Sequence, residues 1–148
     1  MIRSIKKEDK TEYLSLADKF YHTSGVMHTL PNEHFEVTFD TLLEDKTYGD
    51  IFVYEKDNKI VGYILLAKTF SQEAGGIVIW VEELYVLPEF EGKGIGSALF
   101  EYVLGNYKVA RFRLEVEPDN ERAVAIYKKH GFKFIEYQQM LKELKYKV

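Results

Sequence analysis

The stretch of residues 78–102 constrains this chain more than any other. It begins with a run of β-branched, aromatic and aliphatic residues, 78–86, that is interrupted by Glu82 and Glu83. A loop with glycine at every second position follows, and apolar residues recur at helical spacing from Ile95 onward. This order predicts a strand, a glycine turn and a helix. A helix that begins at a glycine turn directs unpaired N–H groups and the positive end of its dipole at the turn, so we predict an anionic phosphate group there.

The rest of the chain alternates between strand-like and helix-like patterns, which predicts an α/β sheet with helices on both faces. We expect a single domain, 1–148, because 148 residues suffice for one hydrophobic core and no linker-like segment divides them. Segment 25–30 lacks a clear period, and we expect it to be a loop that contributes to specificity. The predicted strands are residues 1–6, 50–55, 60–69, 78–86, 110–117, 132–137 and 140–144, and the predicted helices are residues 9–21, 31–43, 95–106 and 121–130.

The charge and residue content exclude several classes of protein. A net charge of −4 argues against a sequence-independent nucleic-acid binder, which needs a basic face, and fits a cationic or small neutral substrate. The chain has no cysteine, which excludes disulfides, thiolate catalysis and cysteine-ligated zinc and agrees with a reducing cytoplasm. The N-terminus has no apolar signal segment, and the longest apolar run, 77–81, is too short to cross a membrane. We therefore predict a soluble cytoplasmic protein.

The four histidines do not form a metal-ligand set. His22, His28 and His34 are six residues apart, which is not a helical or hairpin spacing for ligands. His130 precedes Gly131 at a predicted helix C-terminus, where a cation is favourable. We predict that the protein binds no metal.

The spacing of the glycines distinguishes the loop from nucleotide-binding loops. No G-K-[ST] follows four spacers, and Gly96 comes one position too early after Gly92 and Gly94 for G-x-G-x-x-G. Residues 84–96, L-Y-V-L-P-E-F-E-G-K-G-I-G, instead resemble the pattern L-x-V-x-P-x-[YF]-[QR]-G-x-G-[IV]-G of the GNAT superfamily of N-acetyltransferases. A second block is similar to that family's N-x-x-A-x-x-x-Y-x-x-x-G-F. This block comprises Asn120, Ala123, Tyr127, Gly131 and Phe132.

The resemblance implies a mixed, mostly antiparallel sheet whose central parallel strands splay apart around acetyl-CoA. It also implies that acetyl-CoA is the cosubstrate and that its acetyl group moves to a primary amine by direct attack in a ternary complex. The glycine loop is then expected to bind the pyrophosphate through backbone N–H groups, and the strand before it to bind the pantetheine arm. For the loop alone, the alternative is a plain strand-to-helix turn. The cofactor-binding residues implied by the resemblance are Leu84, Tyr85, Val86, Glu91, Gly92, Lys93, Gly94, Ile95, Gly96, Ser97, Asn120, Ala123 and Tyr127.

Glu91 stands where the family has glutamine or arginine. In the family this position meets the pyrophosphate largely through its backbone N–H group, which glutamate also has. A carboxylate beside a pyrophosphate is nevertheless repelled by it. We expect Lys93, Lys128 or Lys129 to offset this repulsion.

Glu82 and Glu83 are candidate general bases. Strand alternation sends their side chains to opposite faces of the sheet, so both cannot lie in one core. A carboxylate on a central strand is costly unless it is paired, hydrogen-bonded or beside a wet cleft, and there it can accept the proton of an attacking amine, directly or through water. Glu82 matches the position where diamine and some aminoglycoside acetyltransferases of the family carry glutamate, and we prefer it. The alternative is an ion pair with Arg113 or a neighbouring lysine.

Tyr127 matches the family's tyrosine that protonates the departing CoA thiolate. A phenol with an ordinary pKa of about 10 suits that role. The alternative is a core tyrosine at helical spacing from Ala123. Asn120 has two compatible interpretations, a helix cap and a side-chain contact to the cofactor.

Acidic residues concentrate around the predicted cleft and favour a cationic acceptor amine, such as a polyamine, an amino sugar or a lysine-like group of a peptide. We expect the amine to enter beside the first two helices and loop 25–30. Two other functions stay open: a non-catalytic module that senses acetyl-CoA, and a structural interaction protein that does not bind CoA. The resemblance also suggests a homodimer formed through the closing strands. The acidic residues are Glu82, Glu83, Glu115, Glu117 and Asp119.

Overall fold

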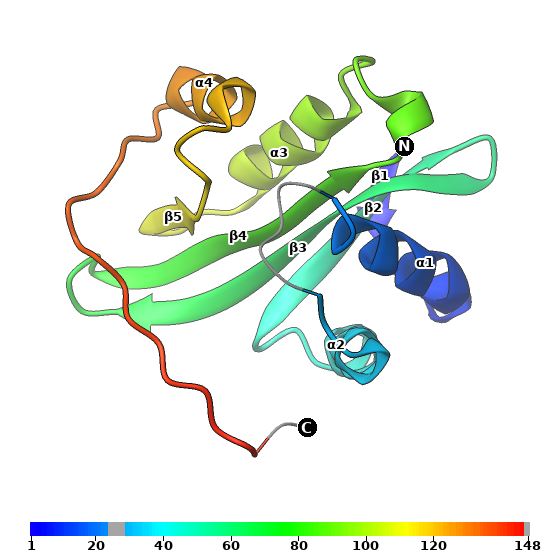
Figure 1. The fold of residues 1–148 in the computed structure, drawn as a ribbon, viewed down its shortest axis with the longest axis horizontal. Helices are drawn as coiled ribbons and strands as arrows, with labels where there is room; N and C mark the ends of the chain where they lie inside the picture. The colour runs from blue at the N-terminus through cyan, green and yellow to red at the C-terminus, as the bar shows by residue number, and fades with distance from the viewer. Residues whose placement is uncertain (24–28, 147–148) are drawn as a thin grey trace. The chain divides into compact units, whose positions relative to one another are not determined.

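The computed structural model describes residues 1–23 and 29–146 (Figure 1). The predicted loop 25–30 therefore lies mostly outside the described residues, as does His28. The chain divides into two compact units, Met1–Glu115 and Val116–Val148, and each is described by itself. The single domain stays a prediction.

The first unit contains one mixed sheet. Its first four strands pair antiparallel with their neighbours, and the fifth pairs parallel with the fourth. This confirms the predicted mixed, mostly antiparallel sheet. The strands are β1 (Ile2–Ser4), β2 (Gly49–Lys56), β3 (Lys59–Ser71), β4 (Gly76–Val86) and β5 (Arg111–Leu114), in the sheet order β1-β2-β3-β4-β5.

The turn between β2 and β3 follows from its sequence. Asp57 and Asn58 both adopt positive φ, 50° and 61°. Two-residue hairpin turns whose central residues have positive φ match the right-handed twist of the strands, and aspartate and asparagine tolerate that conformation. The predicted hairpin is thereby confirmed.

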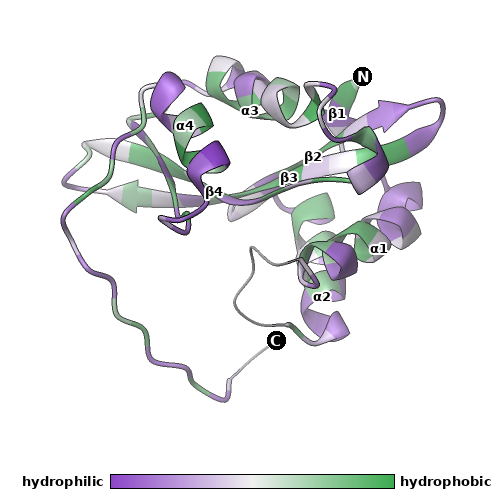
Figure 2. Cartoon of the chain, turned by 45° about the horizontal axis from the view of Figure 1, so that its top comes forward, coloured by the Kyte–Doolittle hydropathy of each residue, from purple (hydrophilic) through white to green (hydrophobic). Residues whose placement is uncertain are grey.

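Helices cover both faces of this sheet, as predicted (Figure 2). After a short 3₁₀ turn, η1 (Lys7–Asp9), helix α1 (Lys10–Phe20) and helix α2 (Asn32–Glu44) lie on one face, and α3 (Ile95–Asn106) lies on the other. The ring of Tyr13 on α1 meets the ring of Tyr63 on β3 edge-on, with 5.1 Å between centroids. On the opposite face, a Cβ added to Gly62 of β3 would lie 3.5 Å from Ile95 of α3, so this helix packs closely on the strand.

The second unit contains the predicted fourth helix, α4 (Glu121–Lys129). The side chain of Asn120 accepts a hydrogen bond from the N–H of Ala123 at 3.3 Å, which confirms the predicted cap. Gly131, with φ of 90°, follows the helix end. There a left-handed residue is favourable because glycine has no Cβ.

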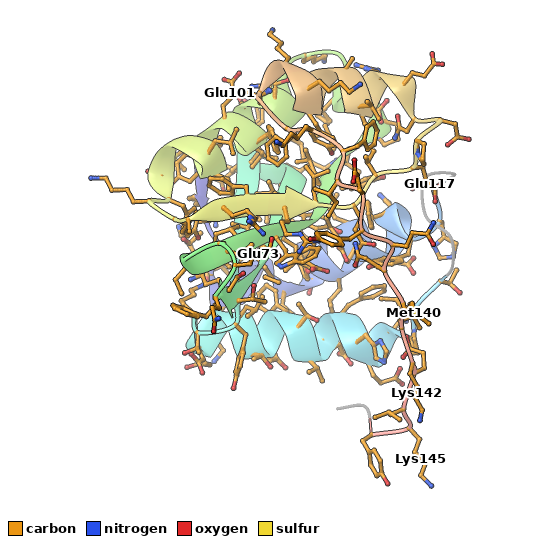
Figure 3. All side chains as sticks on the ribbon, turned by 90° about the vertical axis from the view of Figure 1, so that its left-hand side faces the viewer. Glu73, Glu101, Glu117, Met140, Lys142 and Lys145 are labelled. Atoms are coloured by element: carbon orange, nitrogen blue, oxygen red, sulfur yellow. The ribbon has the colours of Figure 1, made fainter. Side chains whose placement is uncertain are left out.

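The two predicted closing strands, 132–137 and 140–144, are wrong. Within the described residues this segment is irregular, and the side chains of Met140, Lys142 and Lys145 project from it (Figure 3). Tyr137 and Leu141 are 76% and 83% exposed. Strand propensity mainly reflects packing against a neighbouring strand, so apolar content alone did not decide the structure here.

Candidate active site

A β-bulge lies at the centre of β4. Leu65 of β3 pairs with Glu83, but the next residue, Leu66, pairs with Val81. Glu82 is thus an extra residue without a partner on β3. A bulge of this kind interrupts the regular alternation of side chains along a strand.

The bulge places Glu82 and Glu83 on the same face of the sheet. Trp80 pairs with Ala67 and Glu83 pairs with Leu65, and side chains two apart on β3 share a face. Glu82 comes two residues after Trp80, just before the pairing with β3 resumes at Glu83. It therefore continues the alternation from Trp80 and also lies on that face. The prediction that the two glutamates point to opposite faces is wrong, because alternation holds only in an unbulged strand. The shared face is the one covered by α1, since Tyr63 lies on it.

Glu83 is buried and held by two phenols. Tyr21, which follows α1, donates its hydroxyl to Glu83 Oε2 at 2.5 Å, and Tyr63 of β3 donates to Oε1 at 2.7 Å. Burial raises the pKa of Glu83, the two hydrogen bonds oppose that rise, and the charge of Glu82 adds to it. Sequence reasoning missed both tyrosines, because no local pattern connects a residue beyond α1 with one on β4.

Glu82 is exposed and has a raised pKa. The surrounding protein atoms raise it by displacing water, and the charge of Glu115 raises it further. Arg113 lies over the ring of Trp80, 4.3 Å from its centroid. No lysine or arginine among the described residues lies within ion-pair distance of Glu82, so the ion pair considered from the sequence does not form in this part of the chain. Such a carboxylate is accessible and can take a proton.

The far half of β4 has an unpaired edge. The ladder between β4 and β5 joins Val78–Val81 to Arg111–Leu114 and ends there. From Glu82 onward β4 pairs only with β3 among the described residues. In an antiparallel pair, alternate residues direct their N–H and C=O groups away from the partner strand. In the stretch Leu84, Tyr85 and Val86, the backbone groups that face away from β3 can therefore bind an extended amide-containing chain at this edge.

The glycine loop presents a set of free backbone donors. Gly92 and Gly94 have φ of 74° and 80°, which favours glycine, and Gly94 immediately precedes α3. Along the described chain, no N–H group from Gly92 to Ser97 has a backbone acceptor, and that of Ala98 donates to Gly94 O at 2.9 Å. This cluster, which includes Lys93, Ile95 and Gly96, suits a pyrophosphate. The N–H group of Glu91 already donates to Pro88 O at 3.2 Å.

Two lysines place positive charge beside the loop. The ammonium groups of Lys93 and Lys56 lie 5.3 Å and 5.7 Å from the centroid of the Phe90 ring. Lys93 is one of the residues expected to offset the charge of Glu91. Lys56, at the end of β2, was not predicted, because only the fold brings it to the loop.

The second unit carries the remaining predicted site residues. Ala123 and Tyr127 lie on α4, and Asn120 precedes it. Burial raises the pKa of Tyr127, so its phenol keeps its proton more firmly than an exposed tyrosine. Lys128 and Lys129 lie in the last turn of the same helix.

Neither a metal site nor a membrane helix occurs within the part of the chain that the structure describes. No group of three or more histidine, aspartate and glutamate side chains could hold a metal ion there. No described helix is long and apolar enough to cross a membrane.

Replacing Gly94 by alanine should weaken CoA binding about tenfold, because an alanine at φ of 80° is strained by about 1 kcal/mol or deforms the loop. Gly105→Ala is the matched control, since Gly105 lies within α3 and an added Cβ there meets nothing within 4 Å. Calorimetric titration with CoA measures both variants. Equal affinities would show that the loop does not bind the cofactor.

Replacing Glu83 by leucine should lower the free energy of unfolding by about 1–3 kcal/mol, because the fully buried Tyr63 then has a hydroxyl without its partner. Adding Tyr63→Phe should restore most of this loss, since replacing both partners by apolar groups is nearly neutral. Thermal unfolding of the wild type, the single variants and the double variant gives the coupling. If the losses of the two single variants simply added in the double variant, Glu83 and Tyr63 would not be coupled and the hydrogen bond between them would be contradicted.

Comparison with known proteins identifies relatives of the chain. The model of a family described as the acetyltransferase (GNAT) family matches residues 12–132. An uncharacterized N-acetyltransferase of Methanocaldococcus jannaschii is 29% identical over 136 residues, which cover 88% of this chain and 59% of that protein. A spermine/spermidine N(1)-acetyltransferase of Bacillus subtilis is 26% identical over 108 residues, which cover 69% of this chain and 70% of that protein.

The fold also has solved counterparts. The crystal structure of a possible acetyltransferase from Clostridium difficile superposes with a TM-score of 0.83 at 25% identity, over 97% of each chain. The chain spans 59%, 49% and 52% of the lengths of the first three curated relatives that it matches.

Proposed function

The chain belongs to the acetyltransferase (GNAT) family, and on that premise we propose that it transfers an acetyl group from acetyl-CoA to a primary amine. The observation that carries the proposal is the bulge in β4. It sets two carboxylates on one face of the sheet, beside the unpaired edge of the same strand. An amine bound at the carboxylates is then close to a thioester held along that edge.

The residues present fit acetyl-CoA as cosubstrate. The free N–H groups between Gly92 and Ser97 suit its pyrophosphate, with Lys93 and Lys56 adding positive charge. In the stretch Leu84, Tyr85 and Val86, the backbone groups that face away from β3 suit the amides of its pantetheine arm. Acetyl-CoA supplies the activated carbonyl, and side chains of the protein accept and donate the protons.

The reaction needs three proton transfers. Glu82 accepts a proton from the ammonium group, directly or through one water molecule, so that the nitrogen carries a free lone pair. The new C–N bond forms as the C–S bond breaks, and Tyr127 donates its phenolic proton to the departing sulfur. The nitrogen then loses its second excess proton, which returns Tyr127 to the phenol form through water. Glu83 is too deeply buried to receive the amine itself, and we assign the base to Glu82.

The acceptor is a small cationic amine, and a polyamine fits best. Glu82 and Glu115 raise the negative charge on the face of the sheet that Glu83 shares, which attracts a second ammonium group of the same molecule. The name of the Bacillus subtilis relative, a spermine/spermidine N(1)-acetyltransferase, supports the same class. Cytoplasmic location and a homodimer stay predictions from the sequence.

A screen of thiol release tests this function. The protein is mixed with acetyl-CoA and a panel of amines that includes spermidine, an aminoglycoside and a lysine-containing peptide, and free CoA is measured. We expect amine-dependent release that is fastest with the polyamine. CoA binding by calorimetry without release from any amine would instead favour a sensor of acetyl-CoA, and absence of both would favour a structural role.

A further inference from the structure

The hydrogen-bond network of Tyr21, Glu83 and Tyr63 joins three parts of the first unit. Tyr21 follows α1, Tyr63 lies on β3, and Glu83 comes directly after the bulge of β4. Each phenol donates to a different oxygen of the carboxylate, at 2.5 Å and 2.7 Å. Both oxygens of Glu83 are thus engaged by tyrosine donors.

This arrangement leaves the Tyr21 oxygen as a hydrogen-bond acceptor for any further partner. A phenol has one O–H group, and that of Tyr21 is committed to Glu83. In every other direction the oxygen can only accept a hydrogen bond. Tyr63 is fully buried and Glu83 is 8% exposed, whereas Tyr21 is only half-buried. Tyr21 is therefore the member of the network that a substrate can reach.

Neighbouring rings hold the Tyr21 side chain in place. Phe20 lies edge-on to it at 5.0 Å between centroids, and Phe35 of α2 lies at 5.5 Å. A fixed acceptor loses little side-chain freedom when it binds a donor, so one hydrogen bond contributes more to affinity. Burial raises the pKa of the Tyr21 phenol most, and Glu83 raises it further. The charge of Glu82 adds a smaller rise, so Glu82 also acts on Tyr21.

We propose that Tyr21 is a specificity-determining residue whose oxygen accepts an N–H hydrogen bond from the acceptor amine. Glu83 accepts the tyrosine's own O–H and so leaves this oxygen able only to accept. The proposal rests on the proposed acetyl transfer. It predicts a preference for amines over hydroxyl groups. After one proton moves to Glu82, an amine still has an N–H group for Tyr21, whereas an alcohol has none and turns a lone pair toward the tyrosine oxygen.

The test compares Tyr21→Phe with Tyr63→Phe, because both remove one donor from the same carboxylate and only Tyr21 is accessible. With spermidine as acceptor, we expect Tyr21→Phe to raise the KM for spermidine about tenfold, which corresponds to one hydrogen bond. The KM for acetyl-CoA should stay unchanged. Tyr63→Phe should lower the melting temperature but leave the KM for spermidine within about twofold.

The outcomes separate this inference from the proposed function. KM does not depend on the amount of folded enzyme, so partial unfolding of a variant cannot produce the expected difference. If the wild type acetylates spermidine and both variants change its KM equally, or neither does, Tyr21 does not contact the amine and the inference fails alone. If the wild type acetylates no amine, the inference fails together with the proposed function.

Discussion

Replacing Glu82 by glutamine should lower kcat/KM for the amine by about a hundredfold to ten-thousandfold at neutral pH, the usual contribution of a general base. Glutamine preserves the shape of the side chain but cannot take a proton. CoA affinity should not change, because the cofactor is expected to bind through backbone groups of β4 and the glycine loop. The measurement is steady-state kinetics with spermidine, accompanied by calorimetric titration with CoA.

The pH dependence of kcat/KM should have a definite direction. A base works when deprotonated, so kcat/KM should rise as the pH passes upward through the pKa of Glu82, which lies above its ordinary value. Glu115→Gln is the matched control, because Glu115 contributes to that elevation. It should move the rise to lower pH and keep most of the activity, whereas Glu82→Gln should abolish the rise. Activity of Glu82→Gln within about tenfold of the wild type would place the base elsewhere.

Replacing Tyr127 by phenylalanine should lower kcat by about a hundredfold and change KM much less, because a proton donor to the leaving sulfur acts in the transition state. Burial raises the pKa of this phenol, so it stays protonated through the neutral range and can serve as the donor. Tyr137→Phe is the matched control in the same unit, since Tyr137 is 76% exposed. Unchanged turnover in Tyr127→Phe would remove this residue from the mechanism.

Local chemistry explains which parts of the fold were predictable from the sequence. The third predicted helix, 95–106, coincides with α3, because a left-handed glycine starts it and its apolar spacing continues without interruption. The turn at Asp57 and Asn58 was predictable because these two residues tolerate the required φ. The cap at Asn120 was predictable because its side chain accepts from a nearby backbone group.

The remaining features depend on contacts between distant segments. The bulge at Glu82 is a mismatch between two strands, and neither strand alone reveals it. It reversed the predicted orientation of the two glutamates. The expectation that a carboxylate on a central strand must be paired, hydrogen-bonded or beside a wet cleft needed no such contact, because it follows from the cost of burying a charge. Tyr21 and Tyr63 reach Glu83 from separate elements, so no spacing rule could find them.

The central claim is that the bulge of β4 presents an amine to acetyl-CoA, and the fate of the acetyl group tests it most directly. Acetyl-CoA that carries an isotopic label in its acetyl group is incubated with the protein and spermidine, and the products are identified by mass spectrometry. The account predicts labelled N-acetylspermidine from the wild type and its near-absence from Glu82→Gln. Label that appears only in acetate, or that stays in acetyl-CoA although CoA binds, would contradict it.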